Sequence, residues 1–337
     1  MDTNDDDASK LNSETEQKRE AKRIADEKRR KAARSASKEE RLAMVNSFVF
    51  VRHSMVEAGL EALQAMYLFE RGVRANAAAI IASSGVGKSQ LLEGFKRDIL
   101  DLTKDDGAAA SDVVIVEPSW DGQPIHLLNE IAEALRLSLR SDASRMLNDI
   151  VDYVRTAKVA AIALEDLHDL FNMELKTNSK TRWDRDIKQC LKLLRVLMNR
   201  TLVPFIFTTL PSGMRDIIVD PQFNDRVQCK IYLSDWIHSD AEIIVFLNEL
   251  EQELPLQKPS NLSEKPIRKW LVQNAKNTRV ITQNIRDSTR EAILDGSERI
   301  TLALLKRLYP TAPTTPEAGR AAAKRRQSKT VDSGSPS

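Results

Sequence analysis

The feature that most constrains this chain is a short glycine-containing run placed between an apolar segment and a helical pattern. It reads Ala82-Ser83-Ser84-Gly85-Val86-Gly87-Lys88-Ser89 and follows the apolar residues 77–81. The run fits the pattern G-x-x-x-x-G-K-[ST], except that alanine stands at the first position. Between a strand and a helix, such a loop turns its backbone N–H groups toward a polyphosphate. The order of strand, loop, Lys-Ser and helix therefore predicts a phosphate-binding loop and not a chance turn.

The loop residues suggest specific roles in binding a nucleoside triphosphate. We expect Lys88 to reach the β- and γ-phosphates and the Ser89 hydroxyl to hold Mg²⁺. The other residues of the loop, together with the first residues of the helix behind it, are expected to line the same site: Ser83, Ser84, Gly85, Val86, Gly87 and Gln90. Nucleotide binding is thus the primary prediction.

Composition limits the remaining possibilities. A chain of 337 residues is long enough for one large domain or two modest ones. Its hydrophobic content of 42% and charged content of 30% are ordinary for a globular protein. Because the net charge is only +2, bulk electrostatics does not identify a nucleic-acid-binding protein. Any binding to DNA must come from local patches.

Cysteine usage and hydropathy indicate the compartment. Cys190 and Cys229 form no metal-ligand cluster, and both are expected to be buried or half-buried thiols in a reducing environment. The first residues are strongly acidic and do not resemble a signal peptide. No apolar run approaches the ~18 residues that a membrane span needs. We therefore expect a cytoplasmic protein that does not contact a membrane.

Residues at the two ends differ from the rest. Residues 1–44 are mostly charged or polar and are expected to be largely disordered, although 13–34 have the spacing of a solvated helix. Residues 311–337 are also expected to be disordered. This tail carries a basic cluster that either contacts DNA or an acidic partner, or simply aids solubility: Arg320, Lys324, Arg325, Arg326 and Lys329.

Between these ends, apolar runs alternate with helical patterns. The expected strands are 77–81, 113–116, 159–164 and 202–207, and the expected helices are 48–69, 90–101, 124–135, 144–156 and 182–200. Later residues read as helices alone, at 240–254, 266–273, 279–294 and 301–309. This order predicts an α/β nucleotide-binding domain over 45–235, with a mostly parallel sheet covered on both faces, and a small all-α lid over 236–310.

An acidic pair, Glu165-Asp166, follows the third expected strand. In P-loop ATPases this strand ends in an Asp of the Mg²⁺ shell, often followed by a Glu that polarises the attacking water. Here the order is inverted, so Glu165 is the predicted metal-site residue and Asp166 the predicted water-polarising residue. A misplacement of about 1 Å costs on the order of 100-fold in rate. We expect tight binding of the nucleotide with slow hydrolysis. The alternative is an ordinary acidic turn or helix cap.

Four further positions are candidates with structural alternatives. Thr209 ends the pair Thr208-Thr209 after the fourth strand and is either a polar sensor of the γ-phosphate or an ordinary strand-end threonine. Arg226 is either an arginine finger for a neighbouring subunit or a surface arginine. Arg279 opens a lid helix, where it either folds over the nucleotide or is solvated. His168 is expected to be a structural histidine.

Several segments carry a resemblance to a known family. They are 84–89, 165–170, 220–226 and 233–236, supported by 254–262 and 300–302. In this order they are similar to the transposition ATPases of the TniB and TnsC type, which belong to the AAA+ superfamily. The resemblance covers roughly residues 45–308. The chain departs from the family pattern at Ala82 and in the inverted Glu165-Asp166 pair. Both departures are compatible with ATP binding and argue against efficient ATP hydrolysis.

The resemblance implies an ATP- and Mg²⁺-dependent regulator of transposition. Such a protein assembles on double-stranded DNA as a homo-oligomeric ring or helical filament, and recruits or activates a DDE-type transposase without itself cutting strands. By position, Lys88 and Ser89 would bind the phosphates and Mg²⁺, Thr209 would be the sensor, and Arg226 would act on the adjacent subunit.

The sequence is also compatible with two other functions. One is another DNA-associated AAA+ machine of the helicase-loader type. A replication initiator would carry a winged-helix domain after the lid, and the chain leaves no room for one. The other is a nucleotide-gated scaffold that assembles on ATP binding with little hydrolysis.

Overall fold

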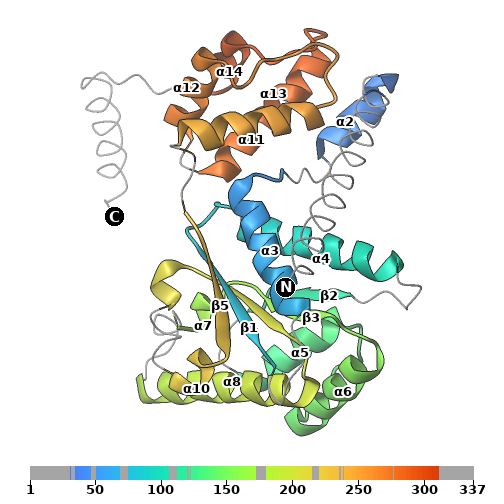
Figure 1. Cartoon of the computed structure of the whole chain (residues 1–337), viewed down its shortest axis with the longest axis vertical. Coiled ribbons are helices and arrows are strands. Elements are labelled where there is room, and N and C mark those ends of the chain that lie inside the picture. The colour runs from blue at the N-terminus through green and yellow to red at the C-terminus, as the bar shows by residue number, and fades with distance from the viewer. Residues whose placement is uncertain are drawn as a thin grey trace, which may run out of the picture. The chain divides into compact units, whose positions relative to one another are not determined.

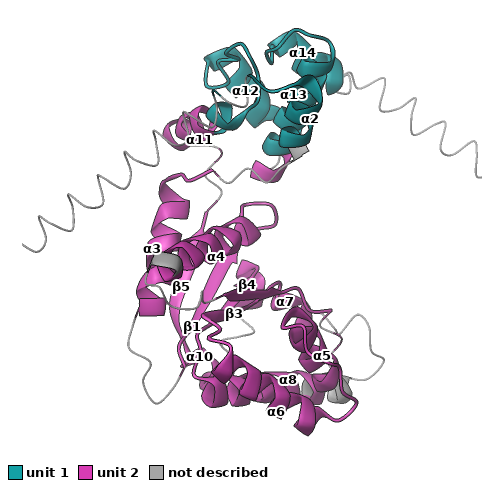
Figure 2. Ribbon diagram, turned by 90° about the vertical axis from the view of Figure 1, so that its right-hand side faces the viewer, with its two compact units in different colours: residues 1–47, 250–276, 281–337 teal, residues 48–249, 277–280 magenta. Residues whose placement is uncertain are grey.

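The chain forms two compact units, coloured separately in Figure 2. The computed structural model describes residues 31, 35–46, 51–68, 75–105, 112–119, 121, 123–171, 180–214, 220–234, 237, 239–275 and 277–310. The unit here called the core unit comprises residues 48–249 and 277–280, and the helical unit comprises 1–47, 250–276 and 281–337. The predicted tail 311–337 and most of the predicted extension 1–44 lie outside the described residues.

The core unit is built on a five-stranded parallel sheet (Figure 1). The strands are β1 (Ala77–Ala82), β2 (Val113–Val116), β3 (Ala161–Leu164), β4 (Phe205–Thr209) and β5 (Val227–Leu233), in the spatial order β2-β3-β4-β1-β5. Every residue of β1 is buried, because small apolar side chains fit a strand covered on both faces. The predicted α/β fold with a parallel sheet is confirmed.

Helices cover both faces of this sheet (Figures 1 and 2). On one face lie α3 (Ser54–Leu68) and α4 (Lys88–Asp105). On the other lie α5 (Pro124–Ala134), α6 (Ala143–Thr156) and α8 (Lys180–Thr201), whose apolar residues form one core with β1 to β4. Two short helices, α7 (His168–Phe171) and α10 (Pro221–Asn224), follow β3 and precede β5.

The strand order decides which loops meet. β4 lies between β3 and β1, with Ile81 opposite Thr209 and Leu164 opposite Phe207. Because the strands are parallel, the segments that follow β1, β3 and β4 emerge at the same edge of the sheet. Ligands of open α/β sheets bind at this carboxyl edge. The glycine-rich loop, the acidic pair and the threonine pair therefore belong to one region.

The helical elements beyond the sheet are α11 (Asp240–Glu253), α12 (Lys265–Asn274), α13 (Thr278–Leu294) and α14 (Leu302–Leu308), as predicted. The predicted boundary at 235/236 differs from the division into units, because residues 240–249, most of α11, belong to the core unit. There Ser54 donates a hydrogen bond to Glu242, and the His53 ring lies edge-on to Phe246. These contacts attach the start of α11 to the start of α3.

The helical unit also includes a helix from the predicted disordered extension. Helix α2 (Lys38–Asn46) begins behind a capping box, in which the Glu40 N–H donates to the Ser37 hydroxyl and the Ser37 N–H donates to the Glu40 carboxylate. Residues 38–44 are therefore ordered helix, which corrects the prediction for that part of 1–44. The S-x-x-E spacing was the sequence signal for this helix.

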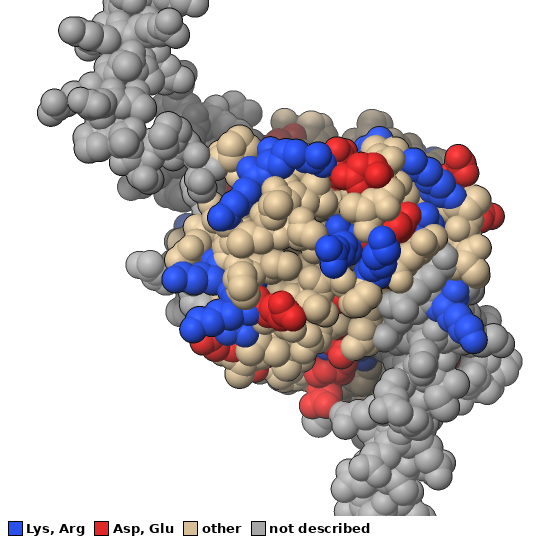
Figure 3. All heavy atoms as spheres, turned by 90° about the horizontal axis from the view of Figure 1, so that it is seen from above, with Lys and Arg blue, Asp and Glu red and all other residues tan. Residues whose placement is uncertain are grey.

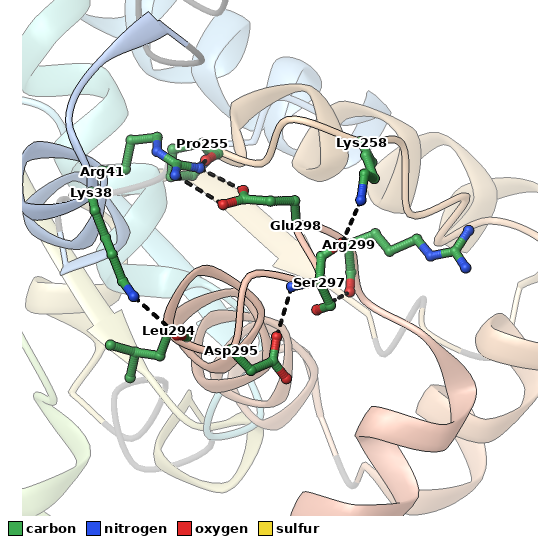
Figure 4. Close-up of polar contacts among 9 residues, drawn as sticks. All are labelled: Lys38, Arg41, Pro255, Lys258, Leu294, Asp295, Ser297, Glu298 and Arg299. Atoms are coloured by element: carbon green, nitrogen blue, oxygen red, sulfur yellow. Dashed lines mark hydrogen bonds and ion pairs between the residues drawn. The ribbon is translucent and has the colours of Figure 1, made fainter.

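A buried ion pair attaches α2 to the rest of the helical unit (Figure 4). The Arg41 guanidinium donates to both carboxylate oxygens of Glu298, at 2.6 and 2.9 Å, and to the Pro255 carbonyl. Lys38 donates to the Leu294 carbonyl. Because Arg41 and Glu298 are only 4% and 9% exposed, their charges depend on one another for compensation.

The surface seen in Figure 3 mixes charges of both signs. Lys and Arg side chains lie among Asp, Glu and uncharged residues, without a continuous single-sign patch on that face. Among the helices of the described residues, none is both long and apolar enough to cross a membrane.

Candidate nucleotide-binding site

The glycine-rich loop has the backbone conformation that its glycines allow. It follows β1 and ends where α4 begins at Lys88. Gly85 and Gly87 have φ values of 79° and 123°, which favour glycine. Ala82, at the position where the pattern has its first glycine, is the last residue of β1 and is 1% exposed. Since this position is ordinary strand, alanine is compatible with the loop, and the departure from the pattern has a structural explanation.

Lys88 is held against the loop. Its Nζ donates to the carbonyl oxygens of Ala82 and Ser83, at 3.1 and 3.4 Å. The side chain is buried, and this desolvation lowers the pKa of Lys88, while the Asp166 and Glu165 carboxylates act in the opposite direction.

Ser89 and Glu165 are brought together across the sheet edge. The Ser89 hydroxyl donates to Glu165 Oε2 at 2.6 Å. Burial raises the pKa of Glu165, and the hydrogen bond from Ser89 opposes that shift. A hydroxyl and a carboxylate next to bound phosphates suit Mg²⁺, which prefers oxygen ligands and keeps several waters. Within the described ranges there is no cluster of three or more His, Cys, Asp or Glu residues able to hold a metal, and a Mg²⁺ bound mainly to phosphates needs none.

Asp166 lies in a tight turn that Thr208 supports. Its φ is 51°, a left-handed conformation that Asp tolerates better than most residues. The Asp166 N–H donates to the Thr208 hydroxyl at 2.8 Å, and the Leu167 N–H donates to the Thr208 carbonyl. The sequence indicated Thr209 as the polar residue here, and its hydroxyl donates to the Leu210 carbonyl. Of the predicted threonine pair, Thr208 is the member whose hydroxyl accepts from the Asp166 N–H, and the sensor role of Thr209 stays a prediction.

Residues 277–280 belong to the core unit and contact the loop directly. The Asn277 amide Nδ2 donates to the Ser84 carbonyl at 3.2 Å, and its Oδ1 accepts from the Val280 N–H at 3.1 Å. The Arg279 N–H donates to the Gly85 carbonyl at 3.2 Å. The Arg279 charge also acts to lower the pKa of Lys88, which agrees with a position near the site. Asn277 was not predicted, although Asn before a helical pattern is a capping signal.

The family model described as "Bacterial TniB protein" matches residues 41–238, which is more than half of the chain. The chain belongs to the TniB family. Among proteins with curated descriptions, none matches. The matched region contains the loop, the acidic pair, both threonines and Arg226, whereas the segment 277–280 lies outside it.

The fold of this TniB family member is similar to that of solved ORC and Cdc6 proteins. The Aeropyrum pernix ORC2 protein, in ADPNP–ADP complexes, has a TM-score of 0.58 at 16% identity, covering 78% of this chain and 70% of that one. The Aeropyrum pernix ORC1 protein in complex with DNA has a TM-score of 0.57 at 14% identity, covering 86% and 71%. Cdc6p from Pyrobaculum aerophilum has a TM-score of 0.51 at 14% identity, covering 77% and 67%. At these identities the likeness establishes the fold alone.

Arg226 is placed away from the glycine-rich loop. Its carbonyl accepts the N–H of Ala77, the first residue of β1, whereas the loop follows the last residue of that strand. Its guanidinium donates to the Gln222 carbonyl and to Asn199 Oδ1. The structure thus brings together Lys88, Ser89, Glu165, Asp166 and Arg279 and leaves Arg226 at the opposite end of the sheet.

His168 begins α7 beside the acidic turn. Its Nδ1 lies 3.8 Å from Asp166 Oδ1 and its Nε2 lies 3.6 Å from Asp169 Oδ1. The ring is largely buried, and the Cα atom of Gly213 approaches so closely that a side chain there would collide with His168. These contacts place His168 beside the turn that carries Asp166, and its structural role stays a prediction.

Proposed function

We propose that this TniB family member binds ATP and Mg²⁺ at the loop Ser83–Ser89. The observation that carries the proposal is the hydrogen bond between Ser89 and Glu165, set beside Lys88 on a loop with two left-handed glycines. The loop amides and Lys88 would bind the phosphates, and Ser89 and Glu165 would hold the metal, which offsets phosphate charge when bound. ORC2 of the same fold, described in ADPNP–ADP complexes, lends support.

Calorimetry tests this proposal directly. Titration of wild-type protein with ATP in the presence of Mg²⁺ should give saturable heat, and Lys88→Ala should abolish it, because the compact cation opposite the phosphates is lost. Lys96→Ala on the same helix removes a cation that pairs with Asp112 instead, and should bind as wild type. Absence of heat from folded wild-type protein would refute nucleotide binding.

We further propose that hydrolysis is slow. Glu165 is engaged with Ser89, so Asp166 remains for polarising water, on a side chain one methylene shorter than the usual Glu. Asp166→Asn should lower turnover at least tenfold while the Kd for ATP stays within about threefold, because Asn tolerates the left-handed turn. Asp152→Asn removes an exposed carboxylate from α6 and should leave turnover unchanged. Wild-type turnover above about 10 per second would contradict slow hydrolysis.

Membership in the family supports a role in transposition. We propose that the ATP-bound protein assembles on double-stranded DNA as a homo-oligomeric ring or helical filament, and recruits or activates a DDE-type transposase at the target. ORC1 of the same fold, described in complex with DNA, is consistent with binding to DNA. The position of Arg226, far from its own loop along β1, is consistent with action on the nucleotide of a neighbouring subunit.

Electron microscopy on duplex DNA with ATP, ADP or no nucleotide tests assembly. Rings or filaments with ATP alone support the proposal, whereas monomers in all three conditions contradict it. If a non-hydrolysable analogue gives the same assemblies and no phosphate is released, the protein is a nucleotide-gated scaffold. Co-sedimentation of the transposase with these assemblies, absent with Lys88→Ala protein, tests recruitment.

A further inference from the structure

The loop needs partners for its carbonyl groups as well as for its amides. When successive N–H groups of a loop converge on an anion, the carbonyls of the same peptides point away and need donors elsewhere. In this chain the carbonyls of Ser84 and Gly85 accept hydrogen bonds from Asn277 Nδ2 and from the Arg279 N–H. Both donors come from the four-residue segment 277–280 of the core unit.

The contact between Asn277 and the loop is close. A Cβ atom built on Gly85 would lie 2.5 Å from Asn277 Nδ2 and 2.6 Å from its Cγ. The amide therefore packs directly against the glycine that has a φ of 79°. The oxygen of the same amide, Oδ1, accepts from the Val280 N–H and fixes the side-chain orientation. One side chain thus both begins α13 and contacts the turn of the loop.

We propose that Asn277 is a positioning residue for the phosphate-binding loop. By accepting from Val280 and donating to Ser84, its amide holds the Ser84 carbonyl outward and keeps the following N–H groups directed at the phosphates. Asn277 does not touch the nucleotide, and it acts on affinity through the loop. This inference rests on the proposed binding of ATP at the loop, and extends it to a residue outside the segment that matches the family.

Asn277→Ser separates the two roles of the side chain. Serine is a good N-cap and carries no charge, so it keeps the acceptor for the helix, but it is too short to donate to Ser84. Asp142→Ala is the matched control, since Asp142 caps α6 through the Arg145 N–H, on the opposite face of the sheet from α4. This control removes a helix cap without altering the loop.

The experiment measures the Kd for Mg-ATP and Mg-tripolyphosphate by calorimetry, and the unfolding temperature without nucleotide. For Asn277→Ser we expect both Kd values to rise about tenfold, the effect of one lost hydrogen bond, at an unfolding temperature within about 2 °C of wild type. Hydrogen exchange of a peptide covering Ser83–Ser89 should also become faster. For Asp142→Ala we expect a lower unfolding temperature and unchanged Kd values.

Three results would overturn the inference: Kd values within twofold of wild type, a loss limited to ATP and not shared by tripolyphosphate, or an equal loss in Asp142→Ala. A loss limited to ATP would mean that Asn277 contacts the nucleoside. These outcomes leave the proposed function standing, because they require a wild-type protein that binds ATP. If wild type binds neither ligand, the proposed function itself fails.

Discussion

Arg41 Nη1 and Nη2 donate to Glu298 Oε2 and Oε1 in a two-pronged ion pair buried within the helical unit (Figure 4). The pair joins residues 257 positions apart in the chain. It also makes α2 part of the helical unit, although α2 lies in a charged stretch that the sequence assigns to disorder. Its energetic role leads to two predictions.

Removing one member of the pair should destabilise the helical unit. Arg41→Ala leaves the Glu298 carboxylate buried without compensation, which costs about 3 kcal/mol for pairs of this kind. Hydrogen exchange of peptides from 254–300 should accelerate strongly. Glu39→Ala, which removes an exposed charge from the same helix, serves as the control and should exchange like wild type. Unchanged exchange in Arg41→Ala would mean that α2 does not stabilise this unit.

The same pair predicts how stability depends on pH. The hydrogen bonds from Arg41, followed by its charge, hold the pKa of Glu298 below its ordinary value of 4.5. A carboxylate with a lowered pKa in the folded state contributes stability above about pH 4.5, and this contribution is lost as the pH falls through the folded value. Between pH 6 and pH 3, the free energy of unfolding measured with denaturant should fall more steeply in wild type than in Glu298→Gln. Parallel profiles for the two proteins would contradict this linkage. The pKa of Asp295 is also lowered, but Asp295 is present in both proteins, so its contribution to the pH dependence cancels in the comparison.

The loop glycines should differ sharply from Ala82 in their response to substitution. Gly85→Ala should weaken ATP binding at least tenfold, because alanine is strained at a φ of 79° and its Cβ meets Asn277. Gly296→Ala controls for strain alone, since Gly296 has a φ of 75° with open space around it, and should not change the Kd.

Ala82→Gly restores the full glycine pattern. Because Ala82 is buried strand, this change should cost about 1 kcal/mol of stability and should not tighten ATP binding. Calorimetry and denaturant unfolding measure the two effects. A tighter Kd in Ala82→Gly would show that the alanine limits the loop after all.

Arg226 should act between subunits. In assemblies on DNA, Arg226→Ala and Asp166→Asn proteins should each lose most ATPase activity, and a mixture of the two should recover part of it. In the mixture, an intact Arg226 from the Asp166→Asn subunit can face an intact Asp166 on its neighbour. Asn199→Ala, which removes one partner of the guanidinium and leaves the charge, controls for local packing. No recovery in the mixture would argue against a role across the interface.

Much of the fold was predictable from local sequence, because the formation of strands, helices and tight turns depends largely on residues that are close together in the chain. The apolar runs of β1 and β3 and the helical spacing of α8 and α13 are short-range signals, and the structure has a strand or a helix at each of them. Ser89 and Glu165, both predicted to hold Mg²⁺, lie within hydrogen-bonding distance because parallel strands end at a common edge. Their role in binding the metal stays a prediction.

The tertiary structure decided what depends on contacts between distant segments. Alanine at position 82 is compatible with the loop because β1 runs one residue further than predicted, so that position 82 has ordinary strand conformation. Thr208, rather than Thr209, supports Asp166 because of the register between β3 and β4. The contact of Asn277 with Ser84 and the pairing of Arg41 with Glu298 join residues about 200 or more positions apart. Hydrophobic periodicity carries no information about such partners, because it reports which face of an element is buried and not what lies against it.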